Sequence, residues 1–157
     1  MCPQARPFIL PRIHPPHPRP TMKPLFAASL LLLAANAHAA TLTLDIQGLT
    51  KKTGHVLIAV HADEASFNDK GKPAAVRTVE VKDAKVTVTI PDLAPGTYAV
   101  SLFHDANDNN KLDTNFIGIP KEGYGFSNNV GARGKPKFDE AKFTLAADGT
   151  VLTLTVF

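Results

Sequence analysis

The chain has 157 residues, enough for one domain, and its net charge of +3 is unevenly distributed. Residues 1–39 contain four of the 17 Lys and Arg and no acidic residue, so residues 40–157 hold 13 basic residues against 14 acidic ones. A near-neutral domain argues against nucleic acid as a partner, because phosphate binding needs a clustered basic face. At 44% hydrophobic residues, the chain is also too apolar for a disordered protein.

Residues 1–21 are rich in Pro, Arg and His and show neither a strand nor a helix period. Two interpretations are open: a start codon assigned too early, with Met22 the true initiator, or a disordered extension. The only cysteine, Cys2, lies in this segment, so residues 40–157 can form no disulfide.

Residues 22–39 have the pattern of an export signal. A short basic start precedes an apolar run over 25–35, and Ala37 and Ala39 are the small residues that signal peptidase requires. The run is too short to cross a bilayer, which takes about 20 residues. We therefore predict a periplasmic or secreted protein that begins at Ala40 and has no membrane span after cleavage.

Apolar and polar residues alternate along residues 40–157, which is the pattern of half-buried strands. Seven short strands of this kind predict an all-β antiparallel sandwich that forms one domain. The Asp-Gly pair at 148–149 predicts a hairpin between the last two strands. The connection over 62–75 has room for a helical turn, and the connection over 105–137 is unusually long. The predicted strands are 41–46, 55–61, 76–81, 85–90, 97–104, 143–145 and 151–156.

The two most apolar of these strands, 55–61 and 97–104, predict where the core lies. One face of the second strand carries large apolar side chains that must pack against one of the two faces of the first. The candidates are Val56, Ile58 and Val60, or the alternate face with Leu57, against Tyr98, Val100 and Leu102.

The long connection opens with carboxylates and amides at alternate positions. Asp105, Asn107, Asn109 and Asp113 fall at the first, third, fifth and ninth positions of an EF-hand-like calcium loop. Lys111 takes the seventh position, where only the backbone carbonyl is used. This pattern makes calcium the one cofactor that the sequence suggests.

The calcium consensus is incomplete at two positions. Asn110 stands where glycine normally allows a sharp turn, although asparagine tolerates a positive φ better than most residues. Phe116 stands where a bidentate glutamate normally completes the ligand set. The alternative is an Asx-rich turn whose side chains bond their own backbone.

The stretch HDANDNNKLDTNFIGIPKEGYGFSNN over 104–129 resembles the signature of a family of small exported bacterial proteins, the domain-of-unknown-function family 2141. The similarity extends to 92–100 and 138–143. It implies an immunoglobulin-like or prealbumin-like sandwich behind a signal peptide, and no established activity. Family members often have glycine where this chain has Asp108 and Asn110.

The glycine-rich end of the loop also carries aromatic rings and amides. Tyr124, Phe126, Asn128 and Asn129 are candidates for a binding face at one end of the sandwich. The alternative, which we favour, is that the apolar residues of the loop, 116–120 included, plug the core. In that case the amides would satisfy backbone groups of the loop.

The sequence predicts a protein without catalytic residues. Ser101, Ser127 and His104 are available, but no nucleophile elbow, zinc-protease, Walker or Rossmann pattern is present. His55 and His61 stand too far apart on one strand to share a metal ion. We expect a binding or accessory module that presents the Asp105–Arg133 loop to an envelope protein or a small ligand. The alternatives are an envelope structural or assembly protein, and an envelope hydrolase.

Overall fold

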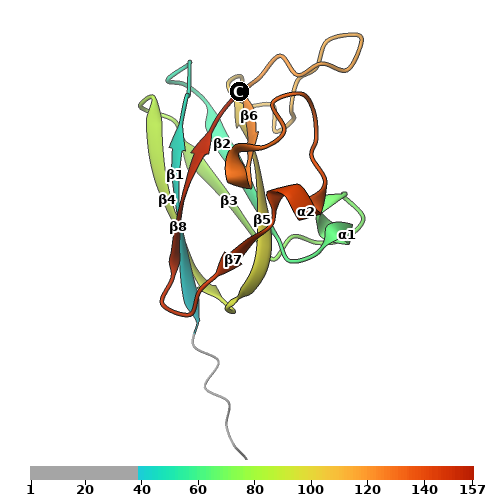
Figure 1. Ribbon diagram of the computed structural model, residues 1–157. Helices are drawn as coiled ribbons and strands as arrows, with labels where there is room; N and C mark the ends of the chain where they lie inside the picture. The colour runs from blue at the N-terminus through green and yellow to red at the C-terminus, as the bar shows by residue number, and fades with distance from the viewer. Residues whose placement is uncertain (1–38) are drawn as a thin grey trace, which may run out of the picture. The chain divides into compact units, whose positions relative to one another are not determined.

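The computed structural model describes residues 39–157, which form eight strands in two sheets (Figure 1). The segment 1–21 and the expected export signal, except Ala39, lie outside these residues. The elements in chain order are β1 (Ala40–Gln47), β2 (His55–His61), α1 (Glu64–Phe67), β3 (Ala75–Glu80), β4 (Lys85–Leu93), β5 (Gly96–Asp105), β6 (Tyr124–Phe126), the 3-10 turn η1 (Ser127–Asn129), α2 (Phe138–Ala141), β7 (Phe143–Leu145) and β8 (Thr150–Thr155).

The two sheets form an all-β sandwich, as predicted, but the sandwich is not wholly antiparallel. The smaller sheet has the order β4-β1-β8, in which β1 pairs antiparallel with β4 and parallel with β8. The larger sheet has the order β3-β2-β5-β6, and β7 also pairs with β5. Alternation within a strand shows which residues face the core, but it carries no information on the direction of the neighbouring strand.

The predicted hairpin at the Asp-Gly pair is wrong, although the turn itself forms. The amide of Gly149 donates to the carbonyl of Ala146 over 3.0 Å, and Gly149 has the positive φ that such a turn needs. The strands on either side then join different sheets, because β7 pairs with β5 and β8 with β1. The turn therefore carries the chain across the sandwich.

The core lies between the sheets and uses the first of the two predicted faces of β2. Val56, Ile58 and Val60 are fully buried, whereas Leu57 is only partly covered. Ile58 stands opposite Leu102 in the register of β2 with β5. The smaller sheet completes this core with buried side chains from β1, β4 and β8, which are Leu42, Leu44, Ile46, Val88, Ile90 and Leu154.

A second, smaller apolar cluster covers the outer face of the larger sheet. Phe67 of α1, Ala141 of α2 and Phe126 of β6 pack over Ala99 of β5. Figure 1 shows both short helices on the side of β5 away from β1 and β4. The helical turn expected within 62–75 is confirmed as α1, which Asp63 caps by accepting a hydrogen bond from the amide of Ser66.

Candidate functional site

Asp105, the last residue of β5, organises the turn that follows it. The residue is 1% exposed, and its two carboxylate oxygens accept hydrogen bonds from the amides of Asn109 and Asn110 over 3.1 and 2.6 Å. Asp108 and Asn110 both have φ near +59°, the left-handed conformation that Asn and Asp adopt more readily than other non-glycine residues. Asp108 and Asn110, where the sequence resemblance led us to expect glycine, thus take a left-handed conformation that glycine adopts readily.

The other predicted ligands close on the same turn. The side-chain amides of Asn107 and Asn109 donate to the two oxygens of Asp113 over 2.7 and 3.0 Å. The amide of Lys111 donates to the side-chain oxygen of Asn109, while the Lys111 side chain is exposed. The structure therefore brings all five predicted residues into one turn, held by the Asx-type hydrogen bonds of the alternative interpretation.

Glu122 is a residue of this turn that the spacing argument missed. One of its carboxylate oxygens accepts from the amide of Ala106 and the other from the amide of Asp113, each over 3.0 Å. Glu122 thereby links Ala106 at the start of the turn to Asp113 at its end, although it is not itself part of the turn. No local pattern could have placed it, because it reaches the turn only after the chain has folded back. Phe116, at the consensus glutamate position, points elsewhere and is exposed.

These residues offer the hard oxygen atoms that calcium prefers, from three carboxylates and two amides. At present the amide nitrogens of Asn107 and Asn109 face Asp113, so calcium would require both amides to rotate and present oxygen instead. Within residues 39–157, no group of three or more His, Cys, Asp or Glu side chains is placed to hold a metal ion. The types of donor atom suit calcium, but their present arrangement does not form an ion site, so the calcium site stays a prediction.

Residues 113–121 form a short hairpin that projects from this turn. Thr114 pairs with Pro120, and the amide of Lys121 donates to the carbonyl of Asp113 over 2.7 Å. At its tip, Phe116 is 98% exposed, Ile117 64% and Ile119 55%. The expectation that the apolar part of this loop would plug the core is therefore wrong for the tip. The one aromatic ring at the tip, that of Phe116, is carried away from the sandwich by a hairpin that closes through backbone hydrogen bonds and the side chain of Asn115.

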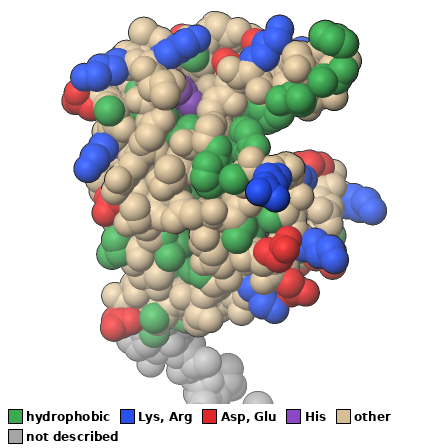
Figure 2. Space-filling view, turned by 45° about the horizontal axis from the view of Figure 1, so that its top comes forward, with side chains coloured by type: hydrophobic (Ala, Val, Ile, Leu, Met, Phe, Trp, Pro, Cys, Tyr) green, Lys and Arg blue, Asp and Glu red, His purple; other side chains and the backbone are tan. Residues whose placement is uncertain are grey.

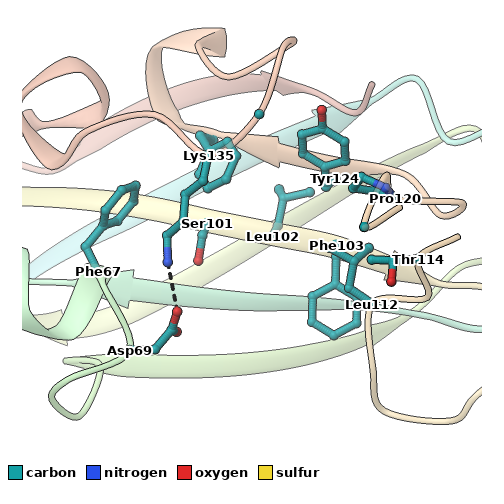
Figure 3. Close-up of a pocket in the computed structure, with 13 residues that line it drawn as sticks. Phe67, Asp69, Ser101, Leu102, Phe103, Leu112, Thr114, Pro120, Tyr124 and Lys135 are labelled. Carbon is teal, nitrogen blue, oxygen red and sulfur yellow. Dashed lines mark hydrogen bonds and ion pairs between the residues drawn. The ribbon is translucent and has the colours of Figure 1, made fainter. Parts of the chain in front are cut away.

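A cleft of about 430 Å³ opens beside this hairpin, on the outer face of the larger sheet (Figure 3). Ser101 and Phe103 of β5 form its floor, and Tyr124 and Phe126 of β6 form one wall. Figure 2 shows the surface hollowed between the projecting apolar tip and the body of the domain. Two of the four predicted binding-face residues thus line a cleft. The opposite walls come from Phe67, Asp69, Leu112, Thr114, Pro120 and Lys135.

The rim of the cleft carries an ion pair. Lys135 Nζ lies 2.8 Å from a carboxylate oxygen of Asp69 and 5.5 Å from the centre of the Phe67 ring. Figure 3 shows this pair spanning the cleft on the side of Phe67. Both side chains are largely exposed, so the pair contributes little stability and can open without a large loss.

The floor of the cleft holds a serine–histidine pair. Ser101 Oγ lies 2.9 Å from His61 Nε2, and the His61 side chain is buried under Phe67. Burial lowers the pKa of His61, and the nearby Asp69 carboxylate offsets only part of this effect. His61 is therefore neutral at pH 7 in the folded protein.

This pKa shift predicts a pH-dependent stability. As pH falls below about 6.5, the unfolded chain binds a proton at His61 before the folded protein does, so the free energy of unfolding falls until pH passes the lower folded-state pKa. Replacing His61→Gln should remove this dependence. Urea titrations of both proteins between pH 7.5 and 5 measure it. Equal pH dependence in the two proteins would contradict the assignment to His61.

Asn128 and Asn129, the other two binding-face candidates, bond to backbone groups. The side-chain amide of Asn128 donates to the carbonyls of Glu140 and Lys142 over 3.0 and 2.9 Å. Asn129 bridges to β8, where it donates to the Thr153 carbonyl and accepts from the Thr155 amide. Both therefore bond backbone groups, as in the alternative interpretation, but these groups belong to the α2 region and to β8 and not to the loop.

Ser127 fills a gap in the hydrogen-bonding edge of β5. β6 pairs with residues 101–103 and β7 with residues 96–98, which leaves Val100 between them. The Val100 amide donates to Ser127 Oγ over 2.9 Å, and that hydroxyl donates to the carbonyl of Ala141. Because Ser127 is fully buried and bonded in this way, it is not placed to act as a nucleophile.

Replacing Ser127→Ala should lower the free energy of unfolding by about 1–3 kcal/mol, because two buried backbone groups lose their partner. Chemical denaturation of the variant measures the loss. The matched control is Thr89→Ala, which removes an exposed hydroxyl from β4 and should change little. Equal stability of the two variants would show that water replaces the Ser127 hydroxyl.

The remaining histidines do not converge on one another. His104 Nε2 donates to the carbonyl of Thr53 over 2.8 Å, and His55 contacts the carboxylate of Asp108. Each histidine of the sandwich thus has a separate partner, as expected from isolated histidines. Ser127 bonds the backbone of Val100 and Ala141, whereas His104 bonds the carbonyl of Thr53, so the two do not form a catalytic pair.

The comparisons with known proteins extend over the same region. A family model described as an uncharacterised protein conserved in bacteria (DUF2141) matches residues 44–153. The match begins within β1 and ends within β8, so it includes both sheets, the calcium-like turn and the cleft. No curated protein and no solved structure matches the chain. Among residues 39–157, no helix is long and apolar enough to cross a membrane.

Proposed function

Because the chain belongs to DUF2141, a family described only as uncharacterised bacterial proteins, we propose its function from the geometry of its loop and cleft. The protein is an exported, non-catalytic binding module that holds a small ligand in the cleft beside the Asp105–Arg133 loop. The observation that carries this proposal is the cleft itself, whose aromatic wall comes from Tyr124 and Phe126 and whose polar floor is Ser101. Sites of this kind combine an apolar lining with a few placed polar groups.

The lining indicates the chemical class of the ligand. Phe67, Phe103 and Tyr124 suit a flat apolar body, and Ser101 can exchange a hydrogen bond with a polar group at the floor. Lys135 stands at the rim, where it can leave Asp69 for an acidic group on the ligand. A small aromatic carboxylate or sulfonate satisfies all three features.

The test uses 1-anilinonaphthalene-8-sulfonate, a fluorescent aromatic sulfonate, as the probe. We expect saturable binding to the folded protein, and at least about tenfold weaker binding to Ser101→Phe, which fills the floor of the cleft. The control Thr89→Phe places the same ring on an exposed position of β4 and should leave probe binding unchanged. Equal binding to all three proteins would contradict the proposal, and a thermal melt of each excludes unfolding as the cause.

Calcium would hold the loop that forms one wall of this cleft. Asp105 and Asp113 lie at the base of the projecting hairpin, whose residues Thr114, Gly118 and Pro120 line the cleft. An ion at the turn would therefore stiffen the wall without touching the ligand. With two amides among its ligands, the site should be weak, with a Kd of about 10⁻⁴–10⁻³ M.

A hydrolase is the second candidate, and the Ser101–His61 pair is the observation that favours it. A neutral histidine within hydrogen-bond reach of a serine is the arrangement that activates a nucleophile. Hydrolysis of a chromogenic acetyl ester by the protein, and its loss in Ser101→Ala, would replace the binding role by this one. Stable co-purification with an envelope protein would instead favour the assembly role.

Export is the part of the proposal that mass spectrometry tests directly. The protein recovered from the producing cells should begin at Ala40, because the small residues Ala37 and Ala39 match the cleavage requirement. A retained Met1 or Met22 would refute the export signal. This result does not depend on the cleft.

A further inference from the structure

We propose that the ligand of the cleft carries an unbranched aliphatic chain, which lies in a trough that continues the cleft across β5, β2 and β3. The inference rests on the proposed function, because it extends the same site and narrows the class of its ligand to alkyl-substituted aromatic acids. Three features of the outer face of the larger sheet support it: a second hollow, a row of small side chains and the pairing of the polar groups that border them.

A second hollow of about 300 Å³ adjoins the cleft on this face. The two hollows share Asp69, Ser101 and Phe103 among their lining residues, so they meet over β5. From there the cleft extends to β6, whereas the second hollow extends the other way, over Ala59 of β2 to Val76 of β3. The two hollows therefore form one groove that crosses the sheet.

The register of the strands makes this groove a straight trough. Val76, Ala59, Ser101 and Phe126 stand opposite one another, one on each of β3, β2, β5 and β6. The two central members of this row are small, so they form a floor. Because neighbouring strands lie about 4.8 Å apart, the row extends over about 14 Å. A trough of this length and direction is filled by a linear chain.

Larger side chains flank the floor on both sides. Leu57 and Phe103 stand opposite each other in the next row of the same face and form one wall. On the other side, the ring of His61 lies under Phe67. Figure 3 shows Ser101 between the rings of Phe67 and Phe103. The trough is thus narrow and bordered mainly by apolar groups, which suits an aliphatic chain.

The polar groups along the trough are already paired. β2 lies between β3 and β5, so the sheet takes up the backbone groups of the floor. Ser101 bonds His61, and Asp69 pairs with Lys135 at the rim. A peptide or a saccharide in the trough would bury donors and acceptors without partners, which is unfavourable, whereas methylene groups have none to lose. Ser101 and Lys135 stand at the cleft end, where the proposed function assigns them to the polar groups of the ligand.

The test compares the binding of 4-ethylbenzenesulfonate and 4-octylbenzenesulfonate by isothermal titration calorimetry, at concentrations at which neither forms micelles. The two compounds share the aromatic sulfonate and differ only in the chain. Full burial strengthens binding about fourfold for each methylene group, and a chain that the trough covers on one side should gain about twofold for each. Because the chains differ by six methylene groups, we expect the octyl compound to bind about sixtyfold more tightly.

The variant Ala59→Phe fills the floor of the trough and should reduce this preference to less than about fivefold. The control Thr89→Phe places the same ring on an exposed position of β4 and should retain the full preference. Thermal melts of both variants verify that they are folded. Equal binding of the two compounds to the unchanged protein would overturn the proposal, and so would a preference that survives in Ala59→Phe.

The two proposals can fail separately. Loss of the trough proposal leaves the binding of 1-anilinonaphthalene-8-sulfonate, and its dependence on Ser101, as evidence for the cleft. Conversely, a chain-length preference that Ala59→Phe removes would support the trough even in a protein that does not bind this fluorescent sulfonate, and the proposed function would then be the part that fails.

Discussion

Replacing Ile58→Ala should lower the free energy of unfolding by about 2–5 kcal/mol. Ile58 is 1% exposed and stands in the middle of β2, the strand between β3 and β5. Its side chain contributes to the core beside Leu102, its partner in the register with β5. The loss combines the transfer of the removed methyl and methylene groups to water with the cavity that they leave. Urea denaturation followed by circular dichroism measures it.

Leu102→Ala should give a loss of the same size, because Leu102 is buried in the same layer. The matched control is Val76→Ala on β3, where the side chain is largely exposed and truncation should change stability by less than about 0.5 kcal/mol. If both core variants are as stable as the control, these strands do not build the core. Ile58 does not line the cleft, so Ile58→Ala should keep probe binding below its melting temperature, whereas Leu102 is one of the lining residues.

Replacing Asp105→Ala should lower the free energy of unfolding by about 2–4 kcal/mol, because two backbone amides lose a charged acceptor. The carboxylate is buried where β5 ends, so water replaces it poorly. The same variant should abolish any response to calcium. At about 10 mM calcium, a Kd of about 10⁻⁴–10⁻³ M predicts about 1.4–2.7 kcal/mol of added stability in the unchanged protein.

Thermal melts with calcium and with chelator measure this response, and the difference between them is the quantity to compare among variants. Asp105→Asn is the matched variant, since it keeps the size of the side chain and removes the charge. Asn110→Gly restores the consensus glycine at a position with positive φ and should retain or increase the calcium response. Identical melts of the unchanged protein with calcium and chelator would end the calcium proposal.

The proposals share one structural origin in β5 and the hairpin that follows it. β5 supplies the cleft floor through Ser101 and Phe103, and it ends at Asp105, on which the turn is built. The hairpin beyond the turn forms a wall of the cleft and carries the exposed tip. Loss of the turn should therefore weaken probe binding.

The sequence by itself determined the positions of most strands and the residues of the turn, whereas it left two faces of β2 open. Alternation with period two identified β2 and β5, because a buried face constrains every second residue. The spacing of Asp105, Asn107 and Asn109 was sufficient for the turn, since residues so close in the chain meet locally whatever surrounds them. These features depend on neighbours within a few positions. The family assignment came from the same loop residues.

The tertiary structure alone decided which strands pair and what the loop does with its apolar residues. The parallel pairing of β1 with β8, the three-residue strand β6 and the contacts of Glu122 join segments far apart in the chain. Periodicity carries no information on such partners, because it is the same for parallel and antiparallel neighbours. Composition predicted that Phe116 would be buried, but the hydrogen bonds of Asn115 complete a hairpin that holds it in solvent. Burial is decided by where the backbone can close its own hydrogen bonds, and for this loop that place lies outside the sandwich.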